Sequence, residues 1–218
     1  MASVDIDSIL KIVKKEYQHW DTPSVTLIAK HHGTPFKVLI ATIISLRTRD
    51  KVTIDAAARL FALADTPRKM MILSEQQIAE AIYPCAFYKN KARQIKEAAK
   101  RLQIEFQGRV PSDIDTLCTF NGVGRKTANL VLVEGYKKPA ICVDTHVHRI
   151  SNRLGYVKTK NPDQTEQMLR EKLPRKHWKK YNEILVAFGQ KICVPISPKC
   201  SECPVSHLCP KRGVTKRR

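Results

Sequence analysis

Residues 110–136 read VPSDIDTLCTFNGVGRKTANLVLVEGY and place two short helical segments on either side of a tight turn. Ser112, with Asp115 three residues later, is typical of the start of a helix, which we expect to end near Phe120. Residues 121–124, NGVG, then break this helix with two glycines, and a second helix follows directly. The stretch therefore predicts a helical hairpin.

The turn of this hairpin suits the docking of a phosphate group. Gly122 and Gly124 carry no side chain, so the backbone can come close to a ligand. The N–H groups that open the next helix point to the same place, with the positive end of the helix dipole behind them. Such turns also simply join helices, but here a basic pair follows at once. We therefore expect a DNA backbone phosphate to bind at Gly122, Val123, Gly124 and Arg125.

The charge balance points to the same kind of partner. The 218 residues include 39 Lys+Arg and 20 Asp+Glu, which gives a formal net charge of +19 at pH 7. Such an excess favours a nucleic acid partner over a merely soluble basic protein. The basic residues are spread along the chain instead of lying on one amphipathic helix, which argues against a membrane-surface role. The N-terminus has no secretory signal, so we expect an intracellular protein.

Apolar residues recur at helical spacing through nearly the whole chain, and alternating strand patterns are almost absent. Residues 38–44, VLIATII, follow Pro35 and are apolar all round, which predicts a fully buried helix. Two further sets fit the i, i+3, i+4, i+7 pattern of a helix face: Ile54, Ala57, Ala58, Phe61 and Ile95, Ala98, Ala99, Leu102. The predicted fold class is all-α.

Four cysteines lie close together near the C-terminus, with the spacing C-x6-C-x2-C-x5-C: Cys193, Cys200, Cys203 and Cys209. Disulfides need an oxidising compartment and are disfavoured in an intracellular chain. A zinc site usually pairs two short knuckles, whereas only Cys200 and Cys203 form one here. An iron–sulfur cluster takes four thiolates on irregular loops, and four prolines keep this stretch out of a helix. The spacing favours the cluster and leaves zinc open.

Two charged residues stand where chemistry could take place. Lys126 lies in the first turn of the second hairpin helix, where the dipole disfavours a cation and should lower the pKa of the ammonium. A neutral amine is a candidate nucleophile, although the pattern alone favours a lysine that contacts phosphate. Asp144 precedes a helical run and is typical of an N-cap. A carboxylate held there could also stabilise positive charge on a sugar.

Three segments, in this order, resemble the endonuclease III family, which comprises helix-hairpin-helix DNA glycosylases with a [4Fe–4S] cluster. They are residues 120–132, FNGVGRKTANLVL, residues 143–155, VDTHVHRISNRLG, and the cysteine loop. Residues 39–50, LIATIISLRTRD, resemble the apolar helix of the family and its following loop, and residues 87–92, FYKNKA, resemble another loop. The resemblance covers nearly the whole chain.

The resemblance implies two helical lobes. Residues 28–138 would form a six-helix barrel that carries the helix-hairpin-helix motif, at about residues 112–135. Residues 1–27 and 139–218 would form a second, discontinuous lobe that holds a [4Fe–4S] cluster in the loop 193–209. The implied partner is double-stranded DNA with damaged bases or abasic sites, bound in the groove between the lobes by a monomer.

The resemblance also implies a reaction in base excision repair. The chain would be a bifunctional DNA N-glycosylase and apurinic/apyrimidinic lyase that removes oxidised pyrimidines. Lys126 would attack C1′ of a nucleotide flipped out of the duplex, form a Schiff base and cut the strand on the 3′ side by β-elimination. Asp144, facing Lys126 across the groove, would stabilise the oxocarbenium-like charge.

Further site residues follow from the same resemblance. Arg47 and Phe87 fall where the family inserts side chains into the gap left by the flipped base, and an aromatic ring could stack there. A core aromatic is the alternative for Phe87. Arg47 stands where the best-known members have glutamine, so the opposite-base preference stays open. Asp50 and His146 would line the base pocket or else make local hydrogen bonds.

Two alternatives to this function remain. One is a monofunctional glycosylase of the same superfamily that acts on mismatched thymine or adenine, although such relatives usually lack the amine found here at Lys126. The other is a non-catalytic DNA-binding module stapled by a metal. For a prokaryotic source we expect the cytoplasm or nucleoid, and no membrane partner.

Overall fold

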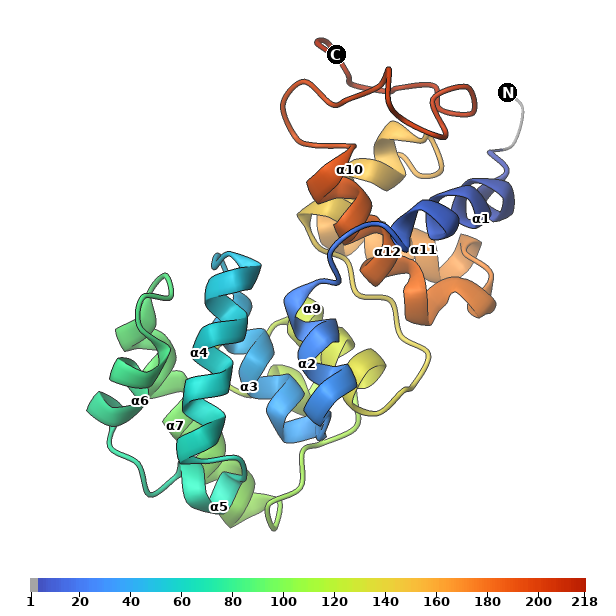
Figure 1. The fold of residues 1–218 in the computed structure, drawn as a ribbon. Helices are drawn as coiled ribbons and strands as arrows, with labels where there is room; N and C mark the ends of the chain where they lie inside the picture. Colours follow the sequence, from blue (N-terminus) through green and yellow to red (C-terminus); the bar gives the residue numbers. More distant parts are fainter. Residues whose placement is uncertain (1–3) are drawn as a thin grey trace. The chain divides into compact units, whose positions relative to one another are not determined.

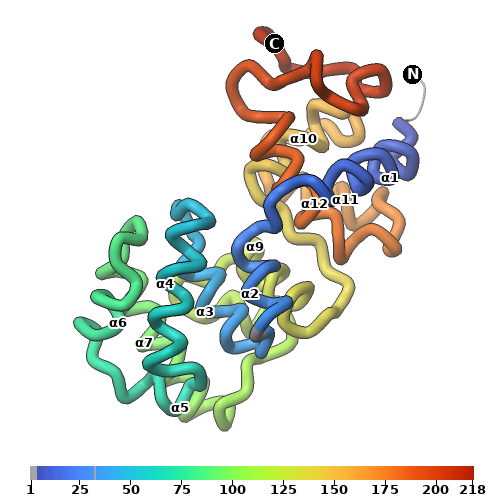
Figure 2. Tube along the Cα trace, in the orientation of Figure 1, coloured from blue at the N-terminus to red at the C-terminus, as the bar shows by residue number. Residues whose placement is uncertain are grey.

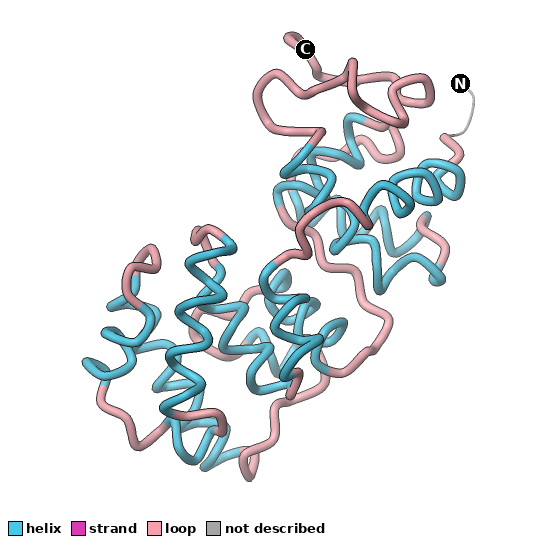
Figure 3. The backbone as a smooth tube through the Cα atoms, viewed as in Figure 1, coloured by secondary structure: helices cyan, strands magenta, loops and turns pink. Residues whose placement is uncertain are grey.

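The computed structural model describes residues 4–218, except for the side chain of His32. All regular secondary structure in this part of the chain is helical, as Figure 3 shows. The all-α class predicted from the sequence is therefore confirmed. The described helices fall into two compact units. None of them has the length and apolar character needed to cross a lipid bilayer.

The first unit, Ser24–Ala140, contains the hairpin and is here called the hairpin unit. Its first helix, α2, packs against α3 and α4. Its elements (Figure 1) are α2 (Ser24–His32), α3 (Pro35–Ser45), α4 (Asp50–Leu63), α5 (Pro67–Met70), α6 (Glu75–Ile82), α7 (Tyr88–Glu105), α8 (Ile114–Cys118), α9 (Arg125–Leu130) and the π-helical turn Val131–Gly135.

The second unit joins the chain up to Pro23 with Ile141–Arg218 and is here called the cysteine unit. Its helices are α1 (Ile6–Tyr17), α10 (Thr145–Arg153), α11 (Pro162–Lys172), the 3-10 turn Arg175–His177 and α12 (Trp178–Lys191). An irregular stretch that carries the four cysteines follows α12. Figure 2 shows the blue α1 beside the orange α12, far apart in sequence but side by side in space.

The helix α3 forms the centre of the hairpin unit. Pro35 occupies its first turn, and the hydroxyl of Thr34 accepts a hydrogen bond from the N–H of Lys37 at 3.2 Å. All residues from Val38 to Ile44 are fully buried, because α2, α4, α7, α9 and the π-helical turn contact this helix. The prediction of a fully buried helix is confirmed. Each buried isoleucine contributes roughly 1.5–3 kcal/mol.

Of the two predicted amphipathic faces, the one on α7 is buried as expected, whereas the one on α4 is shifted by one position. Those residues of α7 that we expected to be buried are buried: Ile95, Ala98, Ala99 and Leu102. In α4 the prediction was wrong by one position, since the buried residues are Thr53, Ala56, Ala57 and Leu60. Both sets fit the helical period. The helix turns its smaller side chains toward α2, α3 and α6, and leaves Phe61 at the edge, where the Lys37 ammonium lies 5.8 Å from the ring centroid.

Candidate functional site

The hairpin begins one residue later than the sequence suggested. Asp113, not Ser112, is the N-cap of α8, and its Oδ1 accepts a hydrogen bond from the N–H of Thr116 at 2.8 Å. The capping-box prediction was therefore wrong, because a carboxylate next to the serine supplies the cap. The helix ends at Cys118, short of the predicted Phe120.

The turn of the hairpin contacts α7 at Asn121 and Gly122 and is open at Gly124. Asn121 Nδ2 donates to Glu97 Oε2 of α7 at 3.1 Å. Gly122 has a φ of 80°, and a Cβ there would lie 2.6 Å from the carboxamide carbon of Gln94. Val123 is buried. Gly124, the N-cap of α9, has no side chain to cap that helix, and a Cβ at this position would meet no atom within 4 Å. The turn can therefore be approached at Gly124.

Lys126 and Asp144 each stand at the start of a helix, but in different units. Lys126 is the second residue of α9 and is half-buried, and Arg125 before it is exposed. Asp144 is the N-cap of α10, as the sequence predicted: its Oδ1 accepts hydrogen bonds from the N–H groups of His146 and Val147, both at 2.9 Å. The cap uses one of the two carboxylate oxygens. That Lys126 and Asp144 face each other stays a prediction.

The polar face of α10 reaches from Asp144 to the first cysteine. The guanidinium of Arg149 donates to the carbonyl of Cys193 at 2.8 Å and lies 3.1 Å from His146 Nδ1. Gly189 of α12 makes room for this contact, because a Cβ there would lie only 2.5 Å from His146 Nδ1. The half-buried His146 thus packs between helices of the cysteine unit, while its part in a base pocket stays a prediction.

Arg153, one turn further along α10, holds the start of the cysteine stretch. Its guanidinium donates to the carbonyls of Val194 and Pro195, each at 2.7 Å, and to Cys193 Sγ at 3.4 Å. Sequence reasoning missed both arginines. The available signal was their spacing, since Arg149 and Arg153 stand four residues apart on one helix face with no acidic residue beside them.

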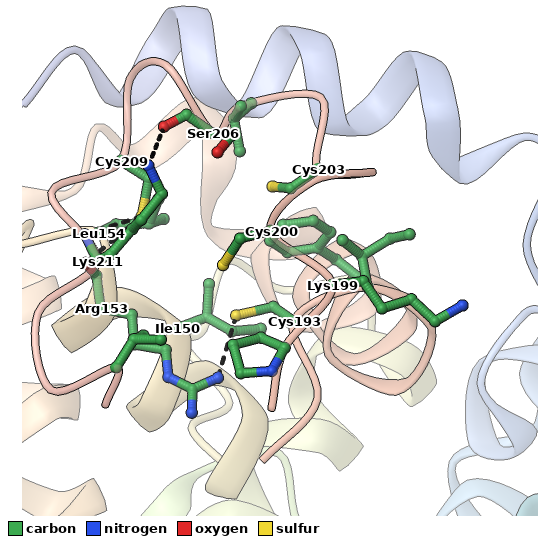
Figure 4. Close-up of a pocket in the computed structure, with 15 residues that line it drawn as sticks. Ile150, Arg153, Leu154, Cys193, Lys199, Cys200, Cys203, Ser206, Cys209 and Lys211 are labelled. Atoms are coloured by element: carbon green, nitrogen blue, oxygen red, sulfur yellow. Dashed lines mark hydrogen bonds between the residues drawn. The ribbon is translucent and has the colours of Figure 1, made fainter. Parts of the chain in front are cut away.

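The four cysteines line one cavity, whose walls also include Ile150 and Leu154 (Figure 4). Within residues 4–218 no three His, Cys, Asp or Glu side chains are placed to hold a single metal ion. Burial raises the pKa of the Cys203 thiol to about 11 and also raises the pKa of Cys209. A cationic centre would offset the effect of burial on these pKa values, because a thiol that coordinates a metal ion is deprotonated outright.

Arg47 and Phe87 come together in the hairpin unit. The guanidinium carbon of Arg47 lies 5.8 Å from the centroid of the Phe87 ring. Phe87 is 63% exposed, so the core-aromatic interpretation was wrong. Both residues have left-handed backbones, with φ of 54° and 57°. The predicted loop 87–92 was also wrong beyond its first residue, because α7 begins at Tyr88.

Asp50 opens α4 and accepts a hydrogen bond from the hydroxyl of Ser24 at 2.5 Å. The half-buried carboxylate of Asp50 thus makes a local hydrogen bond, which was one of the two alternatives predicted for it. Its place in a base pocket stays a prediction.

Two family models match the chain. Residues 40–175 match the HhH-GPD superfamily base excision DNA repair protein, and residues 193–209 match the iron–sulfur binding domain of endonuclease III. The second match covers the four cysteines and their whole loop. Together with the cavity, it assigns these cysteines to an iron–sulfur cluster, as the spacing favoured.

Similar whole proteins agree with these models. Endonuclease III of Thermotoga maritima is 45% identical over 175 residues, which cover 80% of this chain and 82% of that protein. Endonuclease III homolog 1, chloroplastic, of Arabidopsis thaliana is 41% identical, but the chain spans only 48% of its length. A solved structure of a trapped endonuclease III–DNA covalent intermediate superposes with a TM-score of 0.85 at 32% identity, and covers 97% of both chains.

The contacts of Arg153 predict a role in keeping the cluster loop closed. Arg153→Met removes charged donors whose hydrogen bonds are worth roughly 1.5–3 kcal/mol each. We expect the visible absorption of the cluster to bleach several times faster in air. Arg217→Met, a change at an exposed arginine of the C-terminal segment, is the matched control and should bleach like the unchanged protein. Equal rates in all three proteins would contradict the role of Arg153.

Proposed function

This chain belongs to the endonuclease III family of base excision DNA repair glycosylases and lyases, and we propose that Lys126 and Asp144 carry its reaction on oxidised pyrimidines in double-stranded DNA. The observation that carries the proposal is the position of Lys126, two residues after Gly124, where the turn of the hairpin is open. A relative has been solved as a trapped covalent intermediate with DNA, which requires a nucleophile on the protein. An amine beside a phosphate-docking turn supplies one.

In the proposed reaction, the Lys126 amine forms a bond to C1′ while the bond from C1′ to the base nitrogen breaks. The base leaves with that electron pair and takes up a proton. The lysine nitrogen then loses a proton, and its lone pair forms the C=N bond of a Schiff base at C1′ while the bond from C1′ to O4′ breaks and O4′ takes up a proton. Loss of a proton from C2′ expels the phosphate attached at C3′, which cuts the strand by β-elimination. Water later releases the lysine.

Asp144 is proposed to stabilise the positive charge that develops on the sugar. A carboxylate whose Oδ1 is fixed by two amide hydrogens is held in one orientation, so its charge needs little reorganisation during the reaction. The cap engages Oδ1 alone, which leaves Oδ2 as the atom that would approach the substrate. The structural and the chemical role of Asp144 are therefore compatible.

The remaining predicted residues are proposed to hold the DNA. The segment Gly122–Arg125 would bind a phosphate of the lesion strand, and the exposed pair of Arg47 and Phe87 would fill the gap left by the flipped nucleotide. The cysteines would hold a [4Fe–4S] cluster with a structural role, shaping the loop near Lys199 and Lys211. We propose that the protein acts as a monomer, in the cytoplasm or nucleoid if the source is prokaryotic.

Borohydride reduction in the presence of abasic DNA tests the proposed nucleophile. We expect a covalent protein–DNA adduct with the unchanged protein and none with Lys126→Ala, because the Schiff base needs that amine. Lys100→Ala, at an exposed lysine of α7, should still give the adduct. DNA binding by the unchanged protein without any adduct would favour the non-catalytic module, and an adduct that persists in Lys126→Ala would place the nucleophile elsewhere.

Asp144→Asn separates the two roles of this residue. Asparagine caps helices about as well as aspartate, so the free energy of unfolding should change by less than about 0.5 kcal/mol. Base release under single-turnover conditions should nevertheless slow by roughly 10²–10³-fold, since the charge is lost. Asp144→Ala removes the cap as well and should cost about 0.5–2 kcal/mol of stability. Unchanged base release in Asp144→Asn would leave only the capping role.

A panel of lesion duplexes tests the substrate class. Under single-turnover conditions we expect a ring-saturated pyrimidine to be removed at least about tenfold faster than a mismatched thymine or adenine. The three duplexes should share one flanking sequence, so that the rates report the base alone. Faster removal of the mismatched base, without strand cleavage, would favour the monofunctional alternative.

A further inference from the structure

Lys91 is a buried lysine that the proposed reaction does not use. Only 4% of its surface is exposed, although it lies in the first turn of a largely polar helix, α7. Its Nζ donates to the carbonyls of Ile44 and Leu46, both at 2.7 Å, and to the hydroxyl of Thr48 at 2.9 Å. A lysine ammonium has three donors, and all three are used. Burial lowers the pKa of Lys91 to about 8, so the group is still charged near neutral pH.

These acceptors belong to the end of α3 and the segment that follows it. The last carbonyls of a helix have no partner within the helix, and they form the negative end of its dipole. Lys91, which belongs to α7, therefore supplies the hydrogen-bond donors that the carbonyls at the end of α3 lack within their own helix. Arg47 lies between two of the groups that Lys91 holds, the Leu46 carbonyl and the Thr48 hydroxyl.

The left-handed backbone of Arg47 needs this support. A φ of 54° is uncommon for a residue with a side chain, and it persists only where the surroundings hold it. With one bond on each side of Arg47, the Lys91 ammonium brackets the residue. The two bonds hold the chain on both sides of the residue from which the Arg47 side chain extends.

The same lysine also reaches Phe87, through its backbone. The N–H of Lys91 donates to the carbonyl of Phe87 at 3.0 Å, where α7 begins. The segment before Phe87 is held by Arg59 of α4, which donates to the carbonyls of Ala81, at 2.9 Å, and Tyr83. Lys91 thus connects Arg47 and Phe87, the two residues with left-handed backbones whose exposed side chains contact each other.

We propose that Lys91 is a positioning residue that fixes Arg47 and Phe87 as a single wedge for the duplex. The inference rests on the proposed function, and it concerns how the flipped state is reached, not the chemistry at C1′. Loss of the ammonium should release the segment that carries Arg47, and with it the contact of Arg47 with the Phe87 ring, while the backbone bond from Lys91 to Phe87 stays. Flipping and excision in a duplex would suffer, whereas reaction with an abasic site that is already unpaired would not.

The variant Lys91→Met keeps the length and apolar stem of the side chain and removes its donors. The matched control is Lys100→Met, at an exposed position of the same helix. Three readouts separate the wedge from the chemistry: fluorescence of 2-aminopurine next to a ring-saturated pyrimidine in a duplex, excision of that pyrimidine from the duplex, and borohydride trapping on an abasic site in single-stranded DNA. All are measured with enzyme in saturating excess.

We expect Lys91→Met to lower the flipping signal and to slow excision from the duplex by roughly tenfold to a hundredfold, as misplacement of positioning groups does. Trapping on the single strand should change less than about twofold, and Lys100→Met should leave all readouts near those of the unchanged protein. Equal loss of duplex excision and single-strand trapping would overturn the proposal. A missing adduct with the unchanged protein would refute the lyase, while the fluorescence would still decide the role of Lys91.

A double-mutant cycle distinguishes positioning from mere support of the fold. In a chain that already carries Arg47→Ala and Phe87→Ala, Lys91→Met should have little further effect on duplex excision, because the wedge it positions is gone. The same fold-loss in both backgrounds would overturn the proposal. Should Lys91→Met fail to fold, Thr48→Val removes one acceptor and keeps the charge and both carbonyl bonds. It should lower the flipping signal in the same direction, and an unchanged signal would count against the wedge.

Discussion

Backbone groups at the ends of helices have no partner within their own helix, and in this all-helical chain their partners decide where the functional side chains lie. At α10 the free N–H groups bind Asp144 Oδ1. At the end of α3 the free carbonyls bind the Lys91 ammonium. At α9 the cap is Gly124, which offers no side chain. Lys126, Asp144 and Phe87 therefore sit at the start of a helix, and Arg47 follows the end of one, so that their positions are well defined.

Local interactions account for what the sequence could predict. The apolar run after Pro35 has no polar side, so it must be buried whatever surrounds it. The capping role of Asp144 needs only the next three residues. In α4, by contrast, two sets of residues fit the helical period, starting at Thr53 and at Ile54. Contacts with other helices choose between them, and a single sequence does not contain that choice.

Long-range interactions account for what was missed at the candidate site. The acceptors of Lys91 lie 43 to 47 residues away in the chain, and the carbonyl that Arg149 binds lies 44 residues away. Lysine and arginine are ordinarily surface residues, and although the spacing of Arg149 with Arg153 was a local signal, nothing near any of these residues in the sequence identified the distant carbonyls that they bind. The cysteines were found because their ligand set is local, within residues 193–209, and the family match then chose the cluster over zinc.

The pairing of Arg47 with Phe87 has a consequence for the protein before it meets DNA. An aromatic ring that is 63% exposed invites contact with apolar groups of other molecules, including further copies of the same chain. With a guanidinium 5.8 Å from the ring centroid, two such rings could meet only by bringing two cations together. A guanidinium beside the ring therefore disfavours contact between two such rings on electrostatic grounds, whereas a polyanion would be attracted to the cation that lies next to the ring.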